Sequence, residues 1–167
     1  MKTLQIVDEG KSKLIAYRTE NSDDVGKLFL TINDTSGFPM DLLSDLQCVV
    51  DDAGFTDIGL LNVLQVDQEC RGQGLGKKLV QSYCDQIAPK TDIDLVFARV
   101  ENIQATGLDL EKFYESFGFQ AAFFAAGEAL MVNKGKADMI AEALVCLRSQ
   151  RTSHYLHRCS EDDSLEP

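Results

Sequence analysis

One segment, residues 57–100, constrains the fold more than any other part of the chain. It opens with DIGLLNVLQV, a nearly continuous apolar run typical of a strand covered on both faces. Glycines then stand at alternate positions: Gly72, Gly74 and Gly76. An apolar stripe at helical spacing follows and ends before Pro89; it comprises Leu75, Leu79, Val80, Tyr83, Cys84, Ile87 and Ala88. The apolar run DLVFARV completes a predicted βαβ unit.

The residues before this unit predict strands and one helix. TLQIV and KLIAYRT are short and aliphatic, and GKS between them indicates a turn. GKLFLTIN fits either a strand or a helical face, and we favour a strand. Pro39 suits a first helical turn, and the stripe after it predicts a helix that ends at Gly54; the stripe consists of Met40, Leu43, Leu46, Val49 and Val50.

After the unit we expect a helix, a hairpin and a final helix. Asp109 can cap a helix whose apolar face includes Tyr114, and Gly118 suits the position just past its end. FQAAFFAAGEALMVN predicts a hairpin that turns near Gly127, and KADMIAEALVCLRSQ predicts a short amphipathic helix. We therefore expect one domain over residues 1–149 and a polar, flexible tail over 150–167.

Length and composition limit the class of protein. The 167 residues, 44% hydrophobic, suffice for one well-packed domain. No apolar run approaches the 18 residues of a membrane span, and the first residues lack a signal peptide's apolar region, so we expect a cytoplasmic protein. The formal net charge of −11 opposes nucleic-acid binding and mildly favours basic partners; solubility alone would also explain it.

Cysteine and histidine spacing gives little support for a metal site. Five cysteines without a CxxC pair or an export signal favour free thiols over disulfides. His154 and His157 lie close together, and a solvated tail explains them better than a metal site does. We expect no metal.

The glycines were compared with three phosphate-binding patterns. A dinucleotide fingerprint counted from Gly72 needs glycine where Lys77 stands. A P-loop needs Ser or Thr at Lys78 and glycine at Arg71. Only [QR]-x-x-G-x-[GA] is satisfied, by Arg71, Gly74 and Gly76. A turn that binds nothing stays possible, although alternating glycines lower stability through conformational entropy.

With its flanking strand and helix, this pattern resembles the acetyl-CoA-binding motif of the GNAT superfamily of acyl-CoA-dependent N-acyltransferases. FYESFGF, residues 113–119, resembles the superfamily's second signature. The resemblance covers Asp57 to about Asn133 well and the N-terminal third loosely. It implies an α/β (α+β) fold, with a mixed, mostly antiparallel twisted sheet flanked by helices and a central βαβ unit.

The resemblance also implies a cofactor site for acetyl-CoA. The pantetheine arm would pair with backbone groups of Leu64, Gln65 and Val66. The pyrophosphate would lie against the turn and the helix start: Arg71, Gly72, Gln73, Gly74, Leu75, Gly76 and Lys77. Free N–H groups and the dipole at a helix N-terminus favour such an anion. The resemblance assigns Tyr114 as the general acid that protonates the departing thiolate; the alternative is a core aromatic residue.

Three features depart from the superfamily's pattern. No glutamate stands in DIGLLNVLQV, so the general base is open among Asp57, Glu69 and a water that Asn62 could orient. An asparagine that often contacts the cofactor is replaced by Gly107, and Asn102 is the nearest asparagine. The helices expected between the first strands, which usually help to form the acceptor site, are hard to discern.

The leading hypothesis is an N-acetyltransferase that acts on a primary amine, either a small molecule or a basic peptide. A non-catalytic acyl-CoA-binding regulatory module is the alternative, and a cofactor-free interaction domain is a third. The hairpin FQAAFFAAGEALMV is apolar on both faces, so another element must cover it. The terminal helix or a second subunit, in a homodimer, could do so.

Overall fold

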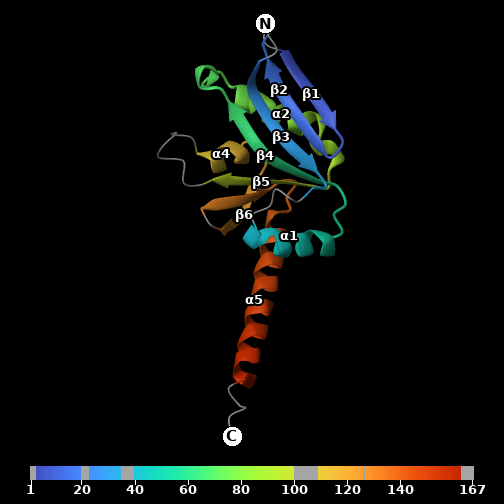
Figure 1. Ribbon diagram of the computed structural model, residues 1–167, viewed down its shortest axis with the longest axis vertical. Helices are drawn as coiled ribbons and strands as arrows, with labels where there is room; N and C mark the ends of the chain where they lie inside the picture. Colours follow the sequence, from blue (N-terminus) through green and yellow to red (C-terminus); the bar gives the residue numbers. More distant parts are fainter. Residues whose placement is uncertain (1–2, 20–22, 35–39, 100–108, 126, 163–167) are drawn as a thin grey trace.

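The computed structural model describes residues 3–19, 23–34, 40–99, 109–125 and 127–162 (Figure 1). Its strands form one sheet in the order β1-β2-β3-β4-β5-β7-β6. The strands are β1 (Thr3–Glu9), β2 (Ser12–Arg18), β3 (Asp24–Ile32), β4 (Ile58–Val66), β5 (Ile93–Arg99), β6 (Gln120–Ala125) and β7 (Glu128–Val132). The helices are α1 (Met40–Asp52), α2 (Leu75–Gln86), α4 (Leu110–Glu115) and α5 (Ala137–Asp162).

Only β4 and β5 pair in parallel, and every other neighbouring pair is antiparallel. The connection between β4 and β5 contains α2, as a parallel crossover requires. The structure thus confirms the mixed, mostly antiparallel sheet and its central βαβ unit. It also confirms that residues 24–32 form a strand and not a helix.

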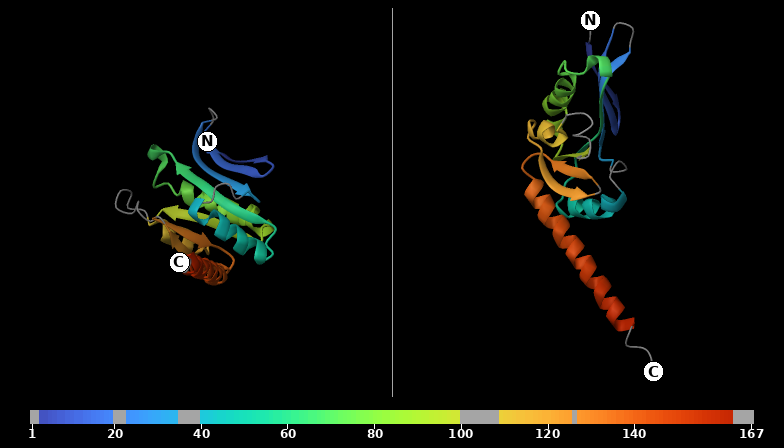
Figure 2. Two further views of the ribbon diagram at one scale, coloured as in Figure 1. Left: turned by 60° about the horizontal axis from the view of Figure 1, so that its bottom comes forward. Right: turned by 90° about the vertical axis from the view of Figure 1, so that its left-hand side faces the viewer.

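The helices cover the sheet in two layers (Figure 2). On one side, called the α2 face, α2 and α4 bury side chains such as Leu79, Tyr83 and Tyr114 against the strands. On the other, called the α1 face, α1 and α5 bury Leu46, Val50 and Leu144. Side chains of β5 and β7 alternate between these two clusters, as the period of a strand requires.

The N-terminal third lacks helices where the superfamily usually has them. Gly10 and Lys11 alone join β1 to β2, and Gly10 has φ +75°. The helix α1 instead stands between β3 and β4 and ends at Asp52, two residues before Gly54, whose φ is +73°. This direct β1–β2 turn leaves no chain length there for a helix.

The expectation that residues 57–66 are covered on both faces is wrong for the second half of β4. Residues Ile58 to Leu61 are buried, but beyond them half-buried and exposed residues alternate, and Val63 is 48% exposed. Phe29 pairs with Val63 and Leu30 with Leu61, so Asn62 is an extra residue, a β-bulge. Without a helix over it, the outer half of β4 stays open on the α1 face.

The C-terminal part follows the sequence closely, except for the length of α5. The Asp109 carboxylate caps α4 by accepting a hydrogen bond from the Lys112 N–H at 3.1 Å, and Gly118 has φ +86°. We expected the last helix within residues 136–150, but α5 continues to Asp162. Residues 150–162 contain no glycine or proline, so no residue there breaks the helix. The domain boundary at 149 stays a prediction.

The terminal helix covers the hairpin on the α1 face. Arg148 of α5 lies 4.8 Å from the centre of the Phe123 ring and donates to the Asp45 carboxylate of α1 at 2.9 Å. Arg151 pairs with the same carboxylate, which joins α5 to α1. Phe124, on the opposite side of β6, remains 58% exposed. One chain therefore covers one face of the hairpin, and the homodimer stays a prediction.

Candidate functional site

The parallel strands β4 and β5 part in the middle of the sheet. Their pairing is recorded from Ile58–Ile93 to Leu61–Val96, among the residues that the structure describes. The bulge at Asn62 comes next, while β4 stays paired with β3 up to Val66. Within the described part of the chain, the backbone of residues 62–66 has no strand partner on its β5 side. We call this place the fork.

The glycine turn lies between the end of β4 and the start of α2. Gly72 and Gly74 have φ values of +74° and +71°, which L side chains rarely adopt. A Cβ added to Gly76 would lie 3.8 Å from side-chain atoms of both Leu64 and Val66. Two of the alternating glycines thus shape the turn, whereas at Gly76 an added Cβ would fit in ordinary van der Waals contact.

The start of α2 is suited to an anion. Gly74 is the N-cap and offers no side chain, so the first-turn N–H groups face outward without a capping oxygen from that residue. The helix dipole adds positive charge there, and Lys77 and Lys78 are exposed in the first turn. A phosphate group is the kind of ligand that such an end attracts.

Two polar residues that were predicted to bind the cofactor, Arg71 and Gln73, form hydrogen bonds within the turn itself. The Arg71 Nε–H donates to the Val66 carbonyl at 3.2 Å, and the Gln73 side chain donates to the Glu69 carbonyl at 3.3 Å. The first bond spans a short 3₁₀ turn, Gln68–Cys70, and the second joins Gln73 to that turn. Leu64 and Val66 point to the α2 face, whereas the intervening Gln65 is exposed.

Tyr114 lies on α4, on the same face as α2. Its side chain is 5% exposed, belongs to the cluster with Leu61, Val96 and Ala98, and makes edge-to-face contacts with the Phe113 and Phe119 rings. The cluster places it beside the strands that part at the fork. Burial raises the pKa of the Tyr114 phenol to about 12.

Because the pKa of Tyr114 is raised in the folded state, the free energy of unfolding should fall as the pH rises in the alkaline range. Between about pH 10 and pH 12 the unfolded tyrosine releases its proton while the folded one keeps it, so rising pH favours unfolding. We expect Tyr114 to lower the free energy of unfolding by about 2–3 kcal/mol over that window. Urea titrations from pH 8 to 11.5 should show a steeper loss for the parent than for Tyr114→Phe; parallel curves would contradict this.

No candidate for the general base is supported by the structure. Asp57 precedes β4, so the whole strand separates it from the glycine turn, and it accepts a hydrogen bond from Asn33 at 3.2 Å. Glu69 is exposed in the 3₁₀ turn. Asn62 lies at the fork, half-buried, and its amide donates to the Thr31 hydroxyl at 3.1 Å. Asn102 and Gly107 lie outside the described residues.

A buried network of polar side chains was not predicted from the sequence. The Tyr83 hydroxyl and the Thr91 hydroxyl each donate to Asp94 Oδ1 at 2.5 Å, and Lys134 Nζ lies 3.6 Å from Oδ2. A Cβ added to Gly59 would lie within 3 Å of both Tyr83 and Asp94. The network joins α2 to β4 and β5 below the fork. An aspartate preceding the apolar run LVFA was its signal in the sequence.

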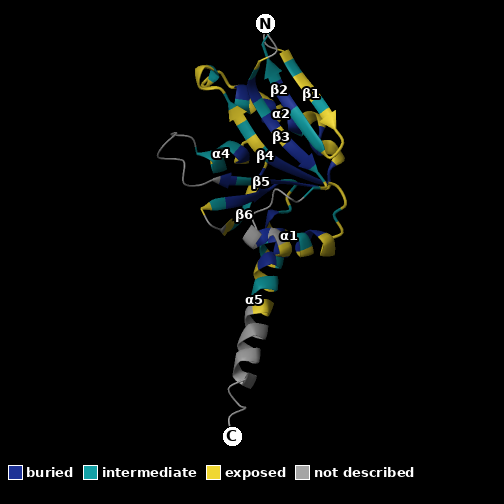
Figure 3. Ribbon diagram, viewed as in Figure 1, coloured by how far each residue is buried: buried dark blue, intermediate teal, exposed yellow. Residues whose placement is uncertain are grey.

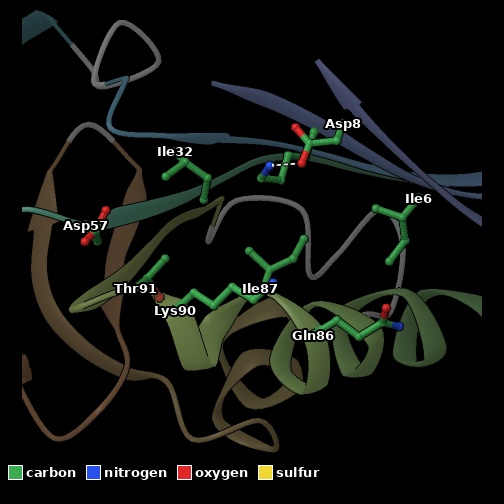
Figure 4. Close-up of a pocket in the computed structure, with 9 residues that line it drawn as sticks. Ile6, Asp8, Ile32, Asp57, Gln86, Ile87, Lys90 and Thr91 are labelled. Carbon is green, nitrogen blue, oxygen red and sulfur yellow. Dashed lines mark hydrogen bonds and ion pairs between the residues drawn. The ribbon is translucent and has the colours of Figure 1, made fainter. Parts of the chain in front are cut away.

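A cavity of about 450 Å³ lies at the other end of β4 (Figure 4). It contains none of the predicted cofactor residues. Three isoleucines line it beside charged groups, of which Asp8 and Lys13 pair with each other at 2.5 Å; the isoleucines are Ile6, Ile32 and Ile87. It adjoins the C-terminal end of α2, whose dipole disfavours an anion, so we do not assign the cofactor to it.

Comparison with known proteins decides the family. The profile of the FR47-like protein family matches residues 42–126, just over half of the chain. The chain belongs to the FR47-like family. The match runs from α1 through β6 and so includes the fork, the glycine turn and α4. This FR47-like protein is a member of the GNAT superfamily, which confirms the resemblance found in the sequence. No curated protein sequence matches it.

PH1933 shows the fold of the FR47-like chain, and two other solved structures are similar to it at lower scores. PH1933 from Pyrococcus horikoshii is 19% identical, with a TM-score of 0.51 over 72% of this chain and 64% of that one. Arabidopsis thaliana Naa50, in complex with a bisubstrate analogue, is 18% identical, with a TM-score of 0.46 over 74% and 72%. The Escherichia coli GNAT family N-acetyltransferase YhbS, in complex with CoA, is 16% identical, with a TM-score of 0.47 over 75% and 61%.

Three further observations concern the described part of this FR47-like protein. None of its helices there has both the length and the apolar character needed to cross a membrane. Within the same residues, His, Cys, Asp and Glu side chains form no group of three that could hold a metal ion. Cys48, Cys70, Cys84 and Cys146, the cysteines whose surroundings the structure describes, form no disulfide.

Proposed function

We propose that this FR47-like protein transfers an acetyl group from acetyl-CoA to a primary amine. The observation that carries the proposal is the position of the glycine turn. It places a helix N-terminus suited to a pyrophosphate directly after the strand whose backbone is unpaired at the fork. One extended ligand with a phosphate end and an amide-bearing arm fits both features.

The backbone of β4 would position the thioester. Amides of the pantetheine arm would pair with the β5-side groups of Leu64, Gln65 and Val66, as a further strand would. A backbone N–H near the bulge would donate to the thioester oxygen, where negative charge develops during the reaction. Holding the thioester and the amine together lowers the entropic part of the barrier.

The transfer needs two proton movements. The neutral amine nitrogen attacks the thioester carbonyl carbon, a C–N bond forms, and the C–S bond breaks with its electron pair going to sulfur. The amine proton would pass to water, since the positions of Asp57 and Glu69 favour neither as the base. Tyr114 would donate its proton to the departing thiolate and regain one from solvent.

The alternative, an acyl-CoA-binding regulatory module without turnover, has one observation in its favour. The raised pKa of Tyr114, about 12, makes the phenol a weaker acid than a free tyrosine. Such a module would bind coenzyme A but release no thiol. A cofactor-free interaction domain would bind none.

A screen for thiol release tests the proposal. We expect free coenzyme A to appear from acetyl-CoA with at least one of several acceptor classes: amines, polyamines, amino acids, aminoglycosides or peptides. Given the net charge of −11, cationic acceptors should react best. Acetyl-CoA should also raise the thermal midpoint, because it binds only the native state. Binding without thiol release would support the regulatory module, and absence of both would support the interaction domain.

A further inference from the structure

Among the described residues, no helix covers the α1 face over the N-terminal strands. Two residues alone join β1 to β2, and α1 lies over the other part of the sheet (Figure 1). Figure 3 shows exposed and half-buried residues along β1 and the outer part of β4. Open sheet faces normally carry polar side chains.

This face instead carries an apolar row. Val7 pairs with Leu14, Leu14 with Phe29, and Phe29 with Val63, so the four side chains form one line across four strands. Phe29 is 37% and Val63 48% exposed, and the other two are half-buried. We call these residues the apolar row. The bulge at Asn62 puts Val63 on this face; on a regular strand Val63 would point to the α2 face.

The row begins at the fork. Val63 follows Asn62 directly, at the place where β4 leaves β5. On the α2 face, α2 and α4 pack beside the fork, whereas among the described residues no helix covers the outer half of β4 on the α1 face, so we place the acceptor on the α1 face. The charged neighbours on the adjacent cross-strand rows, Lys27 and Glu9, have opposite signs, so this face carries no excess of the chain's negative charge.

The dimensions of the row indicate its occupant. Four strands about 4.8 Å apart give a length of about 15 Å, which four or five residues of an extended peptide would span. A stable subunit interface buries about 800 Å² per partner, far more than four partly covered side chains provide.

We propose that the acceptor is a polypeptide whose reacting amine is followed by apolar side chains that lie along the apolar row. This inference rests on the proposed acetyl transfer, since it places the amine at the fork. The peptide crosses the strands instead of pairing with them, so its side chains and not its backbone determine the fit. Phe29 and Val63 are then the residues that determine specificity.

The test compares two six-residue peptides with free N-termini, one with Leu or Val at positions two to four and one with Ser there. We expect kcat/KM for thiol release to be roughly 10–100-fold higher with the apolar peptide, the usual effect of a few buried methylene groups. Phe29→Gln and Val63→Thr should each raise KM for the apolar peptide roughly 10-fold while kcat and KM for acetyl-CoA stay unchanged.

Two matched controls lie away from the row. Phe124→Gln and Val145→Thr make the same changes at exposed apolar residues of β6 and α5, and neither should alter KM. Thermal midpoints of unfolding would identify any variant that does not fold. If Phe29→Gln fails to fold, the smaller change Val63→Thr still tests the inference.

The outcomes separate this inference from the proposed function. Thiol release with small amines but equal rates for both peptides would overturn the inference and leave acetyl transfer intact. If none of the acceptors tested gave thiol release, the acetyl transfer on which the inference rests would be overturned. A dimer in light scattering that Phe29→Gln dissociates would assign the row to a second copy and overturn the peptide assignment.

Discussion

Gly74→Glu should abolish the rise in thermal midpoint that acetyl-CoA produces in the parent protein. Gly74 caps α2 with φ +71°, and no atom lies within 4 Å of the place where a Cβ would project. A glutamate there would put a side chain and a negative charge where we place the pyrophosphate. Its charge would also neutralise the positive end of the helix dipole. The measurement is a thermal unfolding series against acetyl-CoA concentration.

Gly10→Glu is the matched control for this prediction. Gly10 has φ +75°, also lacks any atom within 4 Å of an added Cβ, and lies in the distant β1–β2 turn. Both variants should lose similar stability from backbone strain, about 1–2 kcal/mol, since a side chain is introduced at positive φ in each. Only Gly74→Glu should lose the ligand-induced shift. If acetyl-CoA raised the thermal midpoint of Gly74→Glu as much as that of the parent, the assignment of the cofactor to the turn would be wrong.

Tyr114→Phe should lower the rate of thiol release by roughly 10²–10⁴-fold, the usual contribution of a positioned general acid. The variant keeps the ring and its contacts with Phe113 and Phe119, so packing should survive. Because burial raises the pKa to about 12, the hydroxyl stays protonated at neutral pH but is a weaker donor. We therefore expect a loss near the lower end of that range.

The measurement is steady-state thiol release beside a binding titration with acetyl-CoA. Affinity should change little, because the lost interaction matters mainly in the transition state. Tyr17→Phe, in β2 on the same face, is the control and should leave the rate unchanged. Equal rates for parent and Tyr114→Phe would leave Tyr114 a core residue and make water the proton source. If Tyr114→Phe lost both affinity for acetyl-CoA and the rate of thiol release, we would infer that the hydroxyl binds the cofactor.

The βαβ unit and its glycine turn were predictable because their signals are local. A glycine at positive φ, a helical stripe and a capping aspartate each act over a few residues, so Gly74, α2 and Asp109 could be assigned from the sequence. The FYESFGF segment likewise predicted α4 and the position of Tyr114 on it. Hence the superfamily and most elements could be predicted without the structure.

The fork could not be predicted, because it depends on pairing between distant residues. A bulge at Asn62 exists only in the register of β4 against β3, and no propensity marks it. The same holds for Asp94, which sequence reading placed at a strand start and the fold buries completely against Tyr83. Likewise the pKa of Tyr114 depends on the surrounding core and not on its neighbours in the chain.

The sequence by itself therefore determined the kind of protein: a GNAT-superfamily chain with a glycine turn at a helix start. Only the tertiary structure decided what surrounds that turn. Val7, Leu14, Phe29 and Val63 are scattered over the sequence, and strand pairing alone aligns them into one row. The reason is that backbone conformation is specified locally, whereas exposure and alignment arise from contacts that form only when the sheet assembles.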